Sequence, residues 1–145
     1  MINQYNSSSR MISLLERLLT FSLRKRLEAE GLEITVEEWR ILFYLWNEDG
    51  LYQNDIAKQA KKEKSTITRK IDALVKKGYI QRRSDENDKR NKRVYLTKAG
   101  KNIEKHSMKI AQNITDISEN NISNADMKVF YKVLSTMLIN LDGNT

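Results

Sequence analysis

Three charged residues stand close together where a polar turn gives way to an alternating strand. Asp88, Arg90 and Arg93 follow the spacing D-x-R-x-x-R, and residues 94–97 (VYLT) come directly after them. An arginine at the tip of such a hairpin can enter the narrow, electronegative minor groove of DNA, and the aspartate can hold an arginine in place. A charged turn of this kind, taken alone, is more often only a solvated loop. The residues upstream decide between these two interpretations.

A basic amphipathic helix is predicted upstream, over residues 64–78. Apolar residues recur at helical spacing and predict a buried face made of Ile67, Ile71, Leu74 and Val75. The exposed face of the first turns carries hydroxyls for close approach and cations for phosphates and guanine edges. The candidate DNA-binding residues of this helix are Lys64, Ser65, Thr66, Thr68, Arg69 and Lys70. For this segment taken alone, a capped surface helix with ordinary charges is the alternative.

The excess positive charge of the chain lies in the same segment. The chain of 145 residues carries 26 Lys and Arg against 19 Asp and Glu, a net charge of +7. Residues 53–101 have a balance of +10, whereas the rest of the chain has −3. A basic surface attracts any polyanion, so charge alone does not separate DNA from RNA or acidic lipid. Helix and hairpin together, however, predict a winged helix-turn-helix that grips double-stranded DNA.

The composition argues against several kinds of site. The chain has no cysteine, which removes disulfides, thiolate metal sites and thiol redox sensing. Its one histidine, His106, falls in the middle of an expected helix, where packing or surface exposure is more common than metal ligation. The sequence has no P-loop, dinucleotide-binding or nucleophile-elbow motif. We therefore predict no enzymatic activity, no metal and no cofactor.

The expected location is the cytoplasm. No apolar run approaches the ~20 residues of a membrane span. The first nine residues lack the basic and apolar regions of a signal peptide. We therefore expect a soluble protein without a membrane partner, built as one domain or as one DNA-binding unit with helical additions.

Helices are expected before the basic segment. From Met11 to about Glu30, apolar residues recur at helical spacing over a broad face, and Gly31 ends the pattern. Thr35 can cap the next helix, with Glu38 placed to complete a capping box.

Two further helices are expected after the basic segment. Thr97 is placed to cap a single long helix, and Ser123 is placed to start the last one. Apolar residues of the long helix repeat roughly every seven positions, at Ile103, Ile110, Ile114 and Ile117. With the first helix, these two would supply a helical dimer layer. Packing within one chain is the alternative.

Several motifs occur together in a fixed order between Thr35 and about Lys101. They are Thr35-x-x-x-Trp39-Arg-Ile-Leu, Gln53-Asn-Asp-Ile-Ala57, Ser65-Thr-Ile-Thr-Arg69, Leu74-x-x-x-Gly78-Tyr-Ile, Asp88-x-Arg90-x-x-Arg93 and Val94-x-Leu96-Thr97-x-x-Gly100. In this combination the chain resembles the MarR family of winged-helix transcriptional regulators. The flanking helices resemble the family in length and placement. Tyr52 departs from it, because the family often has a Thr or Ser cap there.

The resemblance implies a mainly α-helical fold, in which a winged helix-turn-helix has a three-helix core and a β-hairpin wing. The N- and C-terminal helices would form a dimerisation layer. The implied parts, in one intertwined unit, are an N-terminal dimerisation helix (1–34), the DNA-binding domain (35–100) and C-terminal dimerisation helices (101–145).

The resemblance also assigns roles to the charged residues. The helix over residues 64–77 would enter the major groove, while Arg90, oriented by Asp88, would reach the minor groove. Arg93 would contact a phosphate or act as a strut within the wing. Two-fold symmetry predicts a pseudo-palindromic operator with half-sites about one helical turn, ~10 bp, apart.

We therefore predict a homodimeric, sequence-specific transcriptional regulator, interpreted as a repressor. Release by a small-molecule effector is a further hypothesis. In this family the effector is often a small aromatic or lipophilic acid held between the dimer layer and the DNA lobe. The candidate lining residues are Leu15, Arg17, Trp39 and Phe43, with Arg17 as a carboxylate partner.

Two alternatives stay open. Trp and Phe at helical spacing are more often plain core, and Arg17 can simply pair with Glu16 or Glu38. The alternative function is an effector-independent nucleic-acid-binding or architectural protein. It would bind unrelated duplexes alike, with a steep salt dependence.

Overall fold

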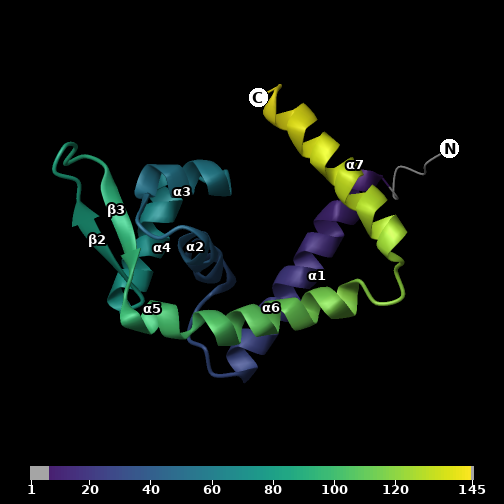
Figure 1. Cartoon of the computed structure of the whole chain (residues 1–145), viewed down its shortest axis with the longest axis horizontal. Coiled ribbons are helices and arrows are strands. Elements are labelled where there is room, and N and C mark those ends of the chain that lie inside the picture. Colours follow the sequence, from purple (N-terminus) through teal and green to yellow (C-terminus); the bar gives the residue numbers. More distant parts are fainter. Residues whose placement is uncertain (1–6, 145) are drawn as a thin grey trace. The chain divides into compact units, whose positions relative to one another are not determined.

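The computed structural model describes residues 7–144 (Figure 1). Its elements in chain order are α1 (Ser8–Ala29), α2 (Val36–Asn47), β1 (Leu51–Tyr52), α3 (Gln53–Ala60), α4 (Lys64–Lys76), β2 (Ile80–Ser84), β3 (Lys92–Leu96), α5 (Lys98–Asn102), α6 (Glu104–Ser118) and α7 (Asn124–Asp142). The chain divides into two compact units between Ile114 and Thr115. The predicted fold, mainly helical with a small sheet, is confirmed.

The core of the first unit forms where α2, α3 and α4 meet the sheet. The side chains that α2 contributes include Leu42, and α3 and α4 contribute Ile56 and Ile71, all three fully buried. Burial of an aliphatic side chain of this size stabilises a fold by about 1.5–3 kcal/mol. Val75 was expected in this face, but that expectation is wrong, because its side chain is 37% exposed. The buried stripe of α4 is therefore narrower than its apolar residues suggest.

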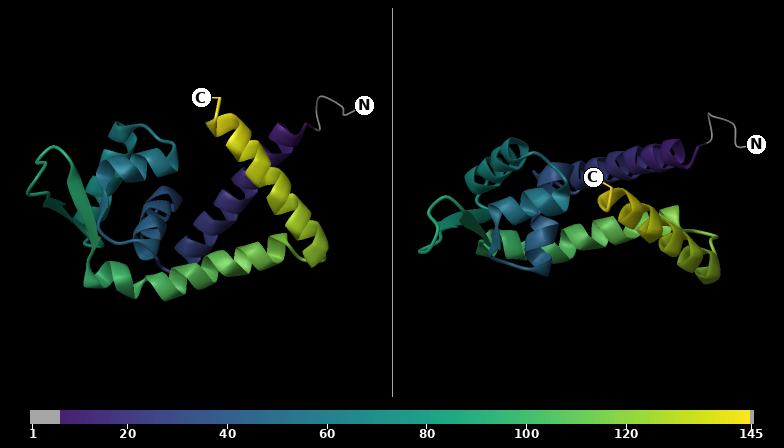
Figure 2. Two further views of the ribbon diagram at one scale, coloured as in Figure 1. Left: turned by 45° about the horizontal axis from the view of Figure 1, so that its top comes forward. Right: turned by 90° about the horizontal axis from the view of Figure 1, so that it is seen from above.

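The sheet has three antiparallel strands in the order β1-β3-β2. Its register pairs Leu51 with Val94 on one side of β3 and Ile80 with Leu96 on the other. The β2–β3 hairpin is the wing, and both views in Figure 2 show its closed end pointing away from α2–α4. Strand β1 was not predicted, because two residues are too few to produce an alternating pattern.

A capping box starts α2, as expected. The backbone N–H of Glu38 donates to Thr35 Oγ1 at 3.1 Å, and Thr35 N–H donates to Glu38 Oε2 at 3.0 Å. Glu38 is buried, and the same Oε2 accepts a hydrogen bond from Lys77 Nζ at 2.7 Å. Since Lys77 follows the last residue of α4, this carboxylate also anchors the end of α4 to the start of α2.

The single long helix expected after Thr97 is instead two helices, α5 and α6, separated at Ile103. Thr97 does cap α5, because its hydroxyl accepts from Gly100 N–H at 3.2 Å. The indole Nε1 of Trp46 donates to the carbonyl of Gly100 at 3.0 Å. In an uninterrupted helix that carbonyl would accept from the N–H of residue 104. The hydrogen bond from Trp46 therefore falls at the place where α5 and α6 separate.

The helix ends elsewhere agree with the sequence. Gly31 has φ +73° and follows α1, as expected for the residue that ends a helix. Ser123 caps α7 by accepting from Asp126 N–H at 3.1 Å. None of the helices in residues 7–144 is long and apolar enough to cross a membrane.

Gly100 gives a direct test of the packing between α5 and the turn from α4 to β2. A Cβ at this position would lie 2.1 Å from the backbone oxygen of Tyr79. We expect Gly100→Ala to lower the free energy of unfolding by about 1–3 kcal/mol, the usual cost of overpacking. Chemical denaturation measures this, with Gly143→Ala as the control, because its Cβ would come no closer than 3.3 Å to a neighbour. Equal stability of the two variants would contradict the packing described here.

Candidate nucleic-acid interface

Helix α4 presents the predicted polar residues on the side away from its buried stripe. Lys64, Ser65 and Arg69 are exposed, whereas Thr66 and Lys70 are half-buried. The first turn of α4 contains no acidic residue. The positive end of the helix dipole and these cations therefore act in the same direction, toward an anion.

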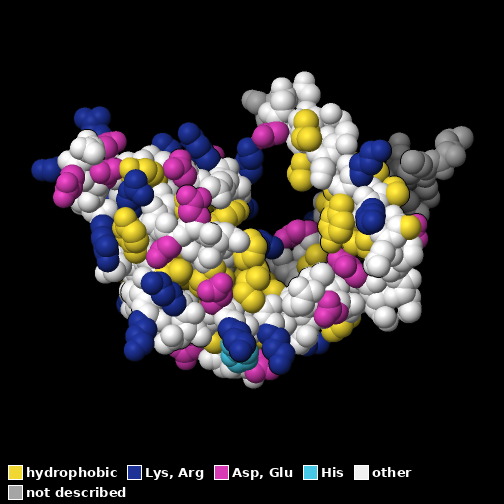
Figure 3. All heavy atoms as spheres, viewed as in Figure 1, with side chains coloured by type: hydrophobic (Ala, Val, Ile, Leu, Met, Phe, Trp, Pro, Cys, Tyr) yellow, Lys and Arg dark blue, Asp and Glu magenta, His cyan; other side chains and the backbone are white. Residues whose placement is uncertain are grey.

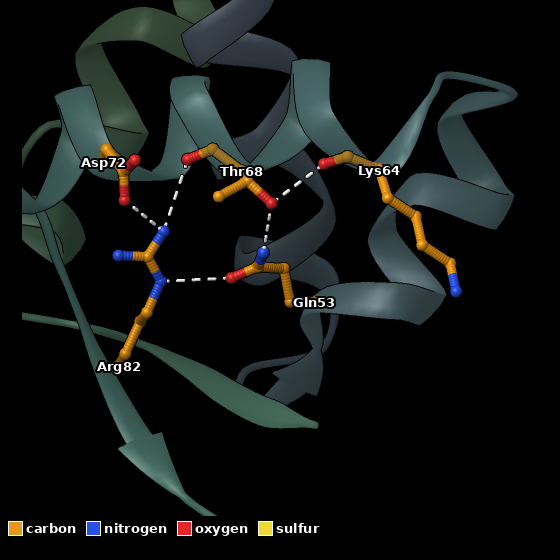
Figure 4. Close-up of polar contacts among 5 residues, drawn as sticks. All are labelled: Gln53, Lys64, Thr68, Asp72 and Arg82. Carbon is orange, nitrogen blue, oxygen red and sulfur yellow. Dashed lines mark hydrogen bonds and ion pairs between the residues drawn. The ribbon is translucent and has the colours of Figure 1, made fainter. Parts of the chain in front are cut away.

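Thr68, also predicted to face DNA, is half-buried and has its hydroxyl engaged within the protein (Figure 4). Its Oγ1 donates to the carbonyl of Lys64 at 2.8 Å and accepts from Gln53 Nε2 at 2.6 Å. These bonds use the hydroxyl hydrogen and one lone pair. Thr68 thus links α4 to α3 through its hydroxyl, unlike the exposed Ser65.

The wing tip is shaped by two aspartates that bind backbone groups. Asp88 Oδ1 accepts from the N–H of Arg90 at 3.0 Å, and Asp85 Oδ1 accepts from the N–H of Asn87 at 3.1 Å. Short polar side chains commonly hold turns in this way. Asp88 therefore fixes the backbone at Arg90, and the Arg90 side chain is exposed. Lys and Arg side chains project from the tip of the wing in Figure 3.

Arg93 lies at the base of the wing and points into the protein. Its guanidinium donates to the carbonyl of Gly50 at 3.1 Å and to the hydroxyl of Tyr52 at 3.0 Å. It also stacks over the Tyr52 ring, with 4.2 Å from Cζ to the ring centroid. Of the two roles expected for Arg93, these contacts are those of a strut.

Tyr52 connects this strut to the far side of the wing. Its side chain does not cap α3, and its hydroxyl instead donates to the carboxylate of Asp85. That hydrogen bond lowers the pKa of the Asp85 carboxyl below its ordinary value and raises the pKa of the Tyr52 hydroxyl. The bond between Tyr52 and Arg93 raises the pKa of the guanidinium. The residue that departs from the family pattern therefore ties β1, β3 and the wing loop together.

Sequence reasoning missed Arg82, which joins β2 to α4 and α3 (Figure 4). Its Nη2 lies 2.5 Å from the carboxylate of Asp72, and its Nε donates to Gln53 Oε1 at 3.0 Å. The sequence nevertheless contained a signal that Arg82 is held within the protein. Two-residue alternation places Arg82 on the same side of the strand as the buried Ile80, where a charged residue needs a partner.

The residues of the predicted effector pocket are only partly brought together. Trp39 and Phe43 are half-buried and stack with ring centroids 5.5 Å apart. Leu15 and Arg17 are exposed on α1. Within residues 7–144, no hydrogen bond or ring contact that we identify joins them to this aromatic pair.

The two acidic residues considered as partners of Arg17 are bound elsewhere. Glu16 pairs with Arg40 at 2.9 Å and accepts a hydrogen bond from the Thr20 hydroxyl at 2.8 Å. Both hydrogen bonds lower the pKa of the Glu16 carboxyl, and the one from Thr20 has the larger effect. Glu38 is held by Lys77 and its own capping box.

The histidine is a surface residue with an acidic neighbour. His106 is exposed, and its Nε2 lies 3.1 Å from Glu30 Oε2. Across residues 7–144, no group of three or more His, Cys, Asp or Glu side chains is arranged to hold a metal ion.

The hydrogen bond between Tyr52 and Asp85 predicts a pH dependence in the wing loop. Because the folded-state pKa of Asp85 is depressed, its stabilisation is present above the ordinary pKa of 3.8 and is lost as the pH falls through the lowered value. We expect Tyr52→Phe to raise the Asp85 pKa toward that ordinary value. Carboxyl titration by NMR measures it. The control is Tyr95→Phe, whose ring lies under Arg83 instead. An unchanged Asp85 pKa in Tyr52→Phe would contradict the assigned cause.

Comparison with known proteins agrees with this geometry. A sequence model of the MarR family matches residues 34–92. The uncharacterized HTH-type transcriptional regulator YwoH of Bacillus subtilis is 34% identical over 111 residues, which are 76% of this chain and 74% of that protein.

Solved structures extend the match over nearly the whole chain. A MarR transcriptional regulator from Methanosarcina mazei Go1 superposes with a TM-score of 0.86 at 31% identity, covering 94% of this chain and 97% of that one. The S. aureus MepR–DNA complex gives a TM-score of 0.84 at 26% identity, covering 92% and 98%. The resemblance noted in the sequence is thereby confirmed: this chain belongs to the MarR family and is a DNA-binding transcriptional regulator.

Proposed function

We propose that this regulator is a homodimeric repressor that binds a pseudo-palindromic operator through α4 and the wing of each subunit. One observation carries the proposal: α4 and the wing tip line a common cleft of about 280 Å³. Its lining includes Thr68 and Asp72 of α4, Arg82 of β2, and Arg90 and Lys92 of the wing. A DNA strand that separates a major groove from the adjacent minor groove must pass between two such elements.

The candidate contacts divide by groove. The exposed first turns of α4, with Ser65 and Arg69, suit the major groove, and Arg90 suits the minor groove. Similarity to MepR supports a DNA-bound state for this fold, since that protein was solved as a complex with DNA. A regulator that contacts the chromosome acts in the cytoplasm of a prokaryotic cell.

Exposed apolar surface supports the dimer. The first half of α1 exposes large apolar side chains, including Met11, Leu14 and Leu18, each more than half exposed. Helix α7 buries none of its residues, and Leu138 and Ile139 are about 70% exposed. Figure 3 shows hydrophobic side chains at the surface of α7. Contiguous apolar surface on helices of this kind marks an interface with another chain. We accordingly assign residues 1–34 and 101–145 to dimerisation and 35–100 to DNA binding.

A small-molecule effector is part of the proposal. The indole Nε1 of Trp39 is buried, with no hydrogen-bond partner among residues 7–144. An unpaired buried donor is costly and supports a ligand with an acceptor group, such as a small aromatic or lipophilic acid. Leu15, Arg17 and Phe43 remain the other proposed contacts.

Selection from a pool of random duplexes tests the central part of the proposal. We expect enrichment of one inverted repeat with half-sites about one turn, ~10 bp, apart. Fluorescence anisotropy should then show binding of that duplex about a thousandfold tighter than random duplex of equal length. A pool that stays random, with affinity set by salt alone, would overturn sequence-specific regulation in favour of an architectural role.

Two arginine substitutions test the groove assignments. Arg90→Ala and Arg69→Ala should each weaken operator binding, by about 1–3 kcal/mol where a base contact is lost. Arg69→Ala should also relax base preference if it reads a base, whereas a uniform loss would mark a phosphate contact. Arg24→Ala on α1 is the matched control, because it removes the same charge outside the basic segment. Full affinity of Arg90→Ala would remove the wing from the mechanism.

The dimer layer is tested separately from DNA binding. Leu138→Asp places a charge on the apolar face of α7 and should shift the sedimentation coefficient from dimer to monomer. Lys132→Asp on the same helix, also exposed, should leave the dimer intact. If both variants stay dimeric, α7 is not the interface.

A further inference from the structure

We propose that Arg82 is a positioning residue for DNA recognition, whose guanidinium sets the wing relative to α4. The inference rests on the proposed function, because it concerns how the two DNA-reading elements are held. The contacts form a small network of four side chains, Arg82, Asp72, Gln53 and Thr68 (Figure 4).

Arg82 connects three elements through one rigid group. From the middle of β2, its Nη2 lies 2.5 Å from Asp72 Oδ1 and donates to the Thr68 carbonyl at 3.3 Å, both on α4. Its Nε donates to Gln53 Oε1, at the first turn of α3, at 3.0 Å. A guanidinium is planar and presents its donors in fixed directions, so these three acceptors fix its orientation.

A further bond closes the network. Gln53 Nε2 donates to the Thr68 hydroxyl at 2.6 Å, and that hydroxyl donates to the Lys64 carbonyl at 2.8 Å. The amide of Gln53 is therefore used at both ends, by Arg82 and by Thr68. Movement of β2 away from α4 would break bonds at all three partners of the guanidinium. The loss of these bonds from a half-buried guanidinium opposes the movement.

The surroundings favour a positioning role over direct contact with phosphate. The side chain of Arg82 lines the cleft between α4 and the wing but is only 21% exposed, and its guanidinium is already bonded to three protein groups. Asp72, in contrast, is 57% exposed on the helix that faces DNA, where a carboxylate repels phosphates. An acid at that position would by itself weaken DNA binding. Its ion pair with Arg82 gives it a structural role that favours binding.

The neighbouring residue provides a matched control. Arg83 stands next to Arg82 on the opposite face of β2, and its guanidinium stacks over the Tyr95 ring at 4.5 Å. Arg83→Met removes the same charge from the same strand but leaves the network intact. Differences between the two variants therefore report the network and not the net charge of the wing.

The experiment measures operator affinity against salt concentration for Arg82→Met, Asp72→Asn, the double variant and Arg83→Met. We expect Arg82→Met to bind about tenfold or more weakly, with an unchanged salt slope, because no phosphate contact is lost. Asp72→Asn should also bind more weakly, although it removes a negative charge. The double variant should bind the operator no more weakly than whichever single variant binds it more weakly, because both changes break one network.

A measurement without DNA separates this inference from the proposed function. Amide hydrogen exchange of the free protein should accelerate at residues 85–92 in Arg82→Met and Asp72→Asn, and not in Arg83→Met. Wild-type protein that selects no operator would refute the proposed function and leave this exchange result standing. Thermal unfolding identifies a variant that fails to fold, and Arg82→Lys, which keeps the charge but not the fork, then takes its place with the same expectations.

Two results would overturn the positioning role. In the first, Arg82→Met lowers the salt slope by about one and Asp72→Asn tightens binding, as a phosphate contact and a repelling acid predict. In the second, Arg82→Met and Asp72→Asn change neither affinity nor exchange relative to Arg83→Met. Either outcome would mean that the network does not control DNA recognition.

Discussion

The pairing of β3 on both of its edges is the constraint on which the DNA-binding unit depends. β3 lies between β1 and β2, and Val94 and Leu96 bury their side chains in the core. A shift of one residue in register would turn these side chains out of the core, so the register is strongly fixed. The register of β3 therefore fixes where three other features lie. They are the wing tip before β3, Arg93 within it and the Thr97 cap of α5 after it.

The cations of the basic segment serve two different purposes. Arg82, Arg93 and Lys77 are bound to protein acceptors and hold elements together. Arg69 and Arg90, in contrast, are exposed on α4 and on the wing tip. The balance of +10 over residues 53–101 therefore overstates the charge available to phosphates. Direct contacts with phosphates come from the exposed cations, whereas the bonded ones contribute only to the overall positive field.

The sequence predicted what depends on local pattern and missed what depends on tertiary contact. The capping box of α2, the ends of α1 and α7 and the hairpin followed from residues within a few positions of each other. The break at Ile103 did not, and it coincides with a tertiary contact, the hydrogen bond from Trp46, more than fifty residues away, to the Gly100 carbonyl. Likewise, the roles of Arg82 and Arg93 depend on partners that lie on distant elements. In the sequence, only the alternation of the strands distinguishes these two residues from surface arginines. Asp88 was expected to hold an arginine and does so through the backbone N–H of Arg90.

Dimethyl sulfate footprinting on the selected operator tests whether α4 and the wing of two subunits read adjacent grooves, because it methylates guanine N7 in the major groove and adenine N3 in the minor groove. We expect protection of guanine N7 at two half-sites about one helical turn (~10 bp) apart, and of adenine N3 in the minor groove flanking each half-site. Arg90→Ala should remove only the flanking minor-groove protection. Uniform protection without symmetry, unaffected by Arg90→Ala, would contradict the account and indicate a protein that covers the DNA backbone without reading it.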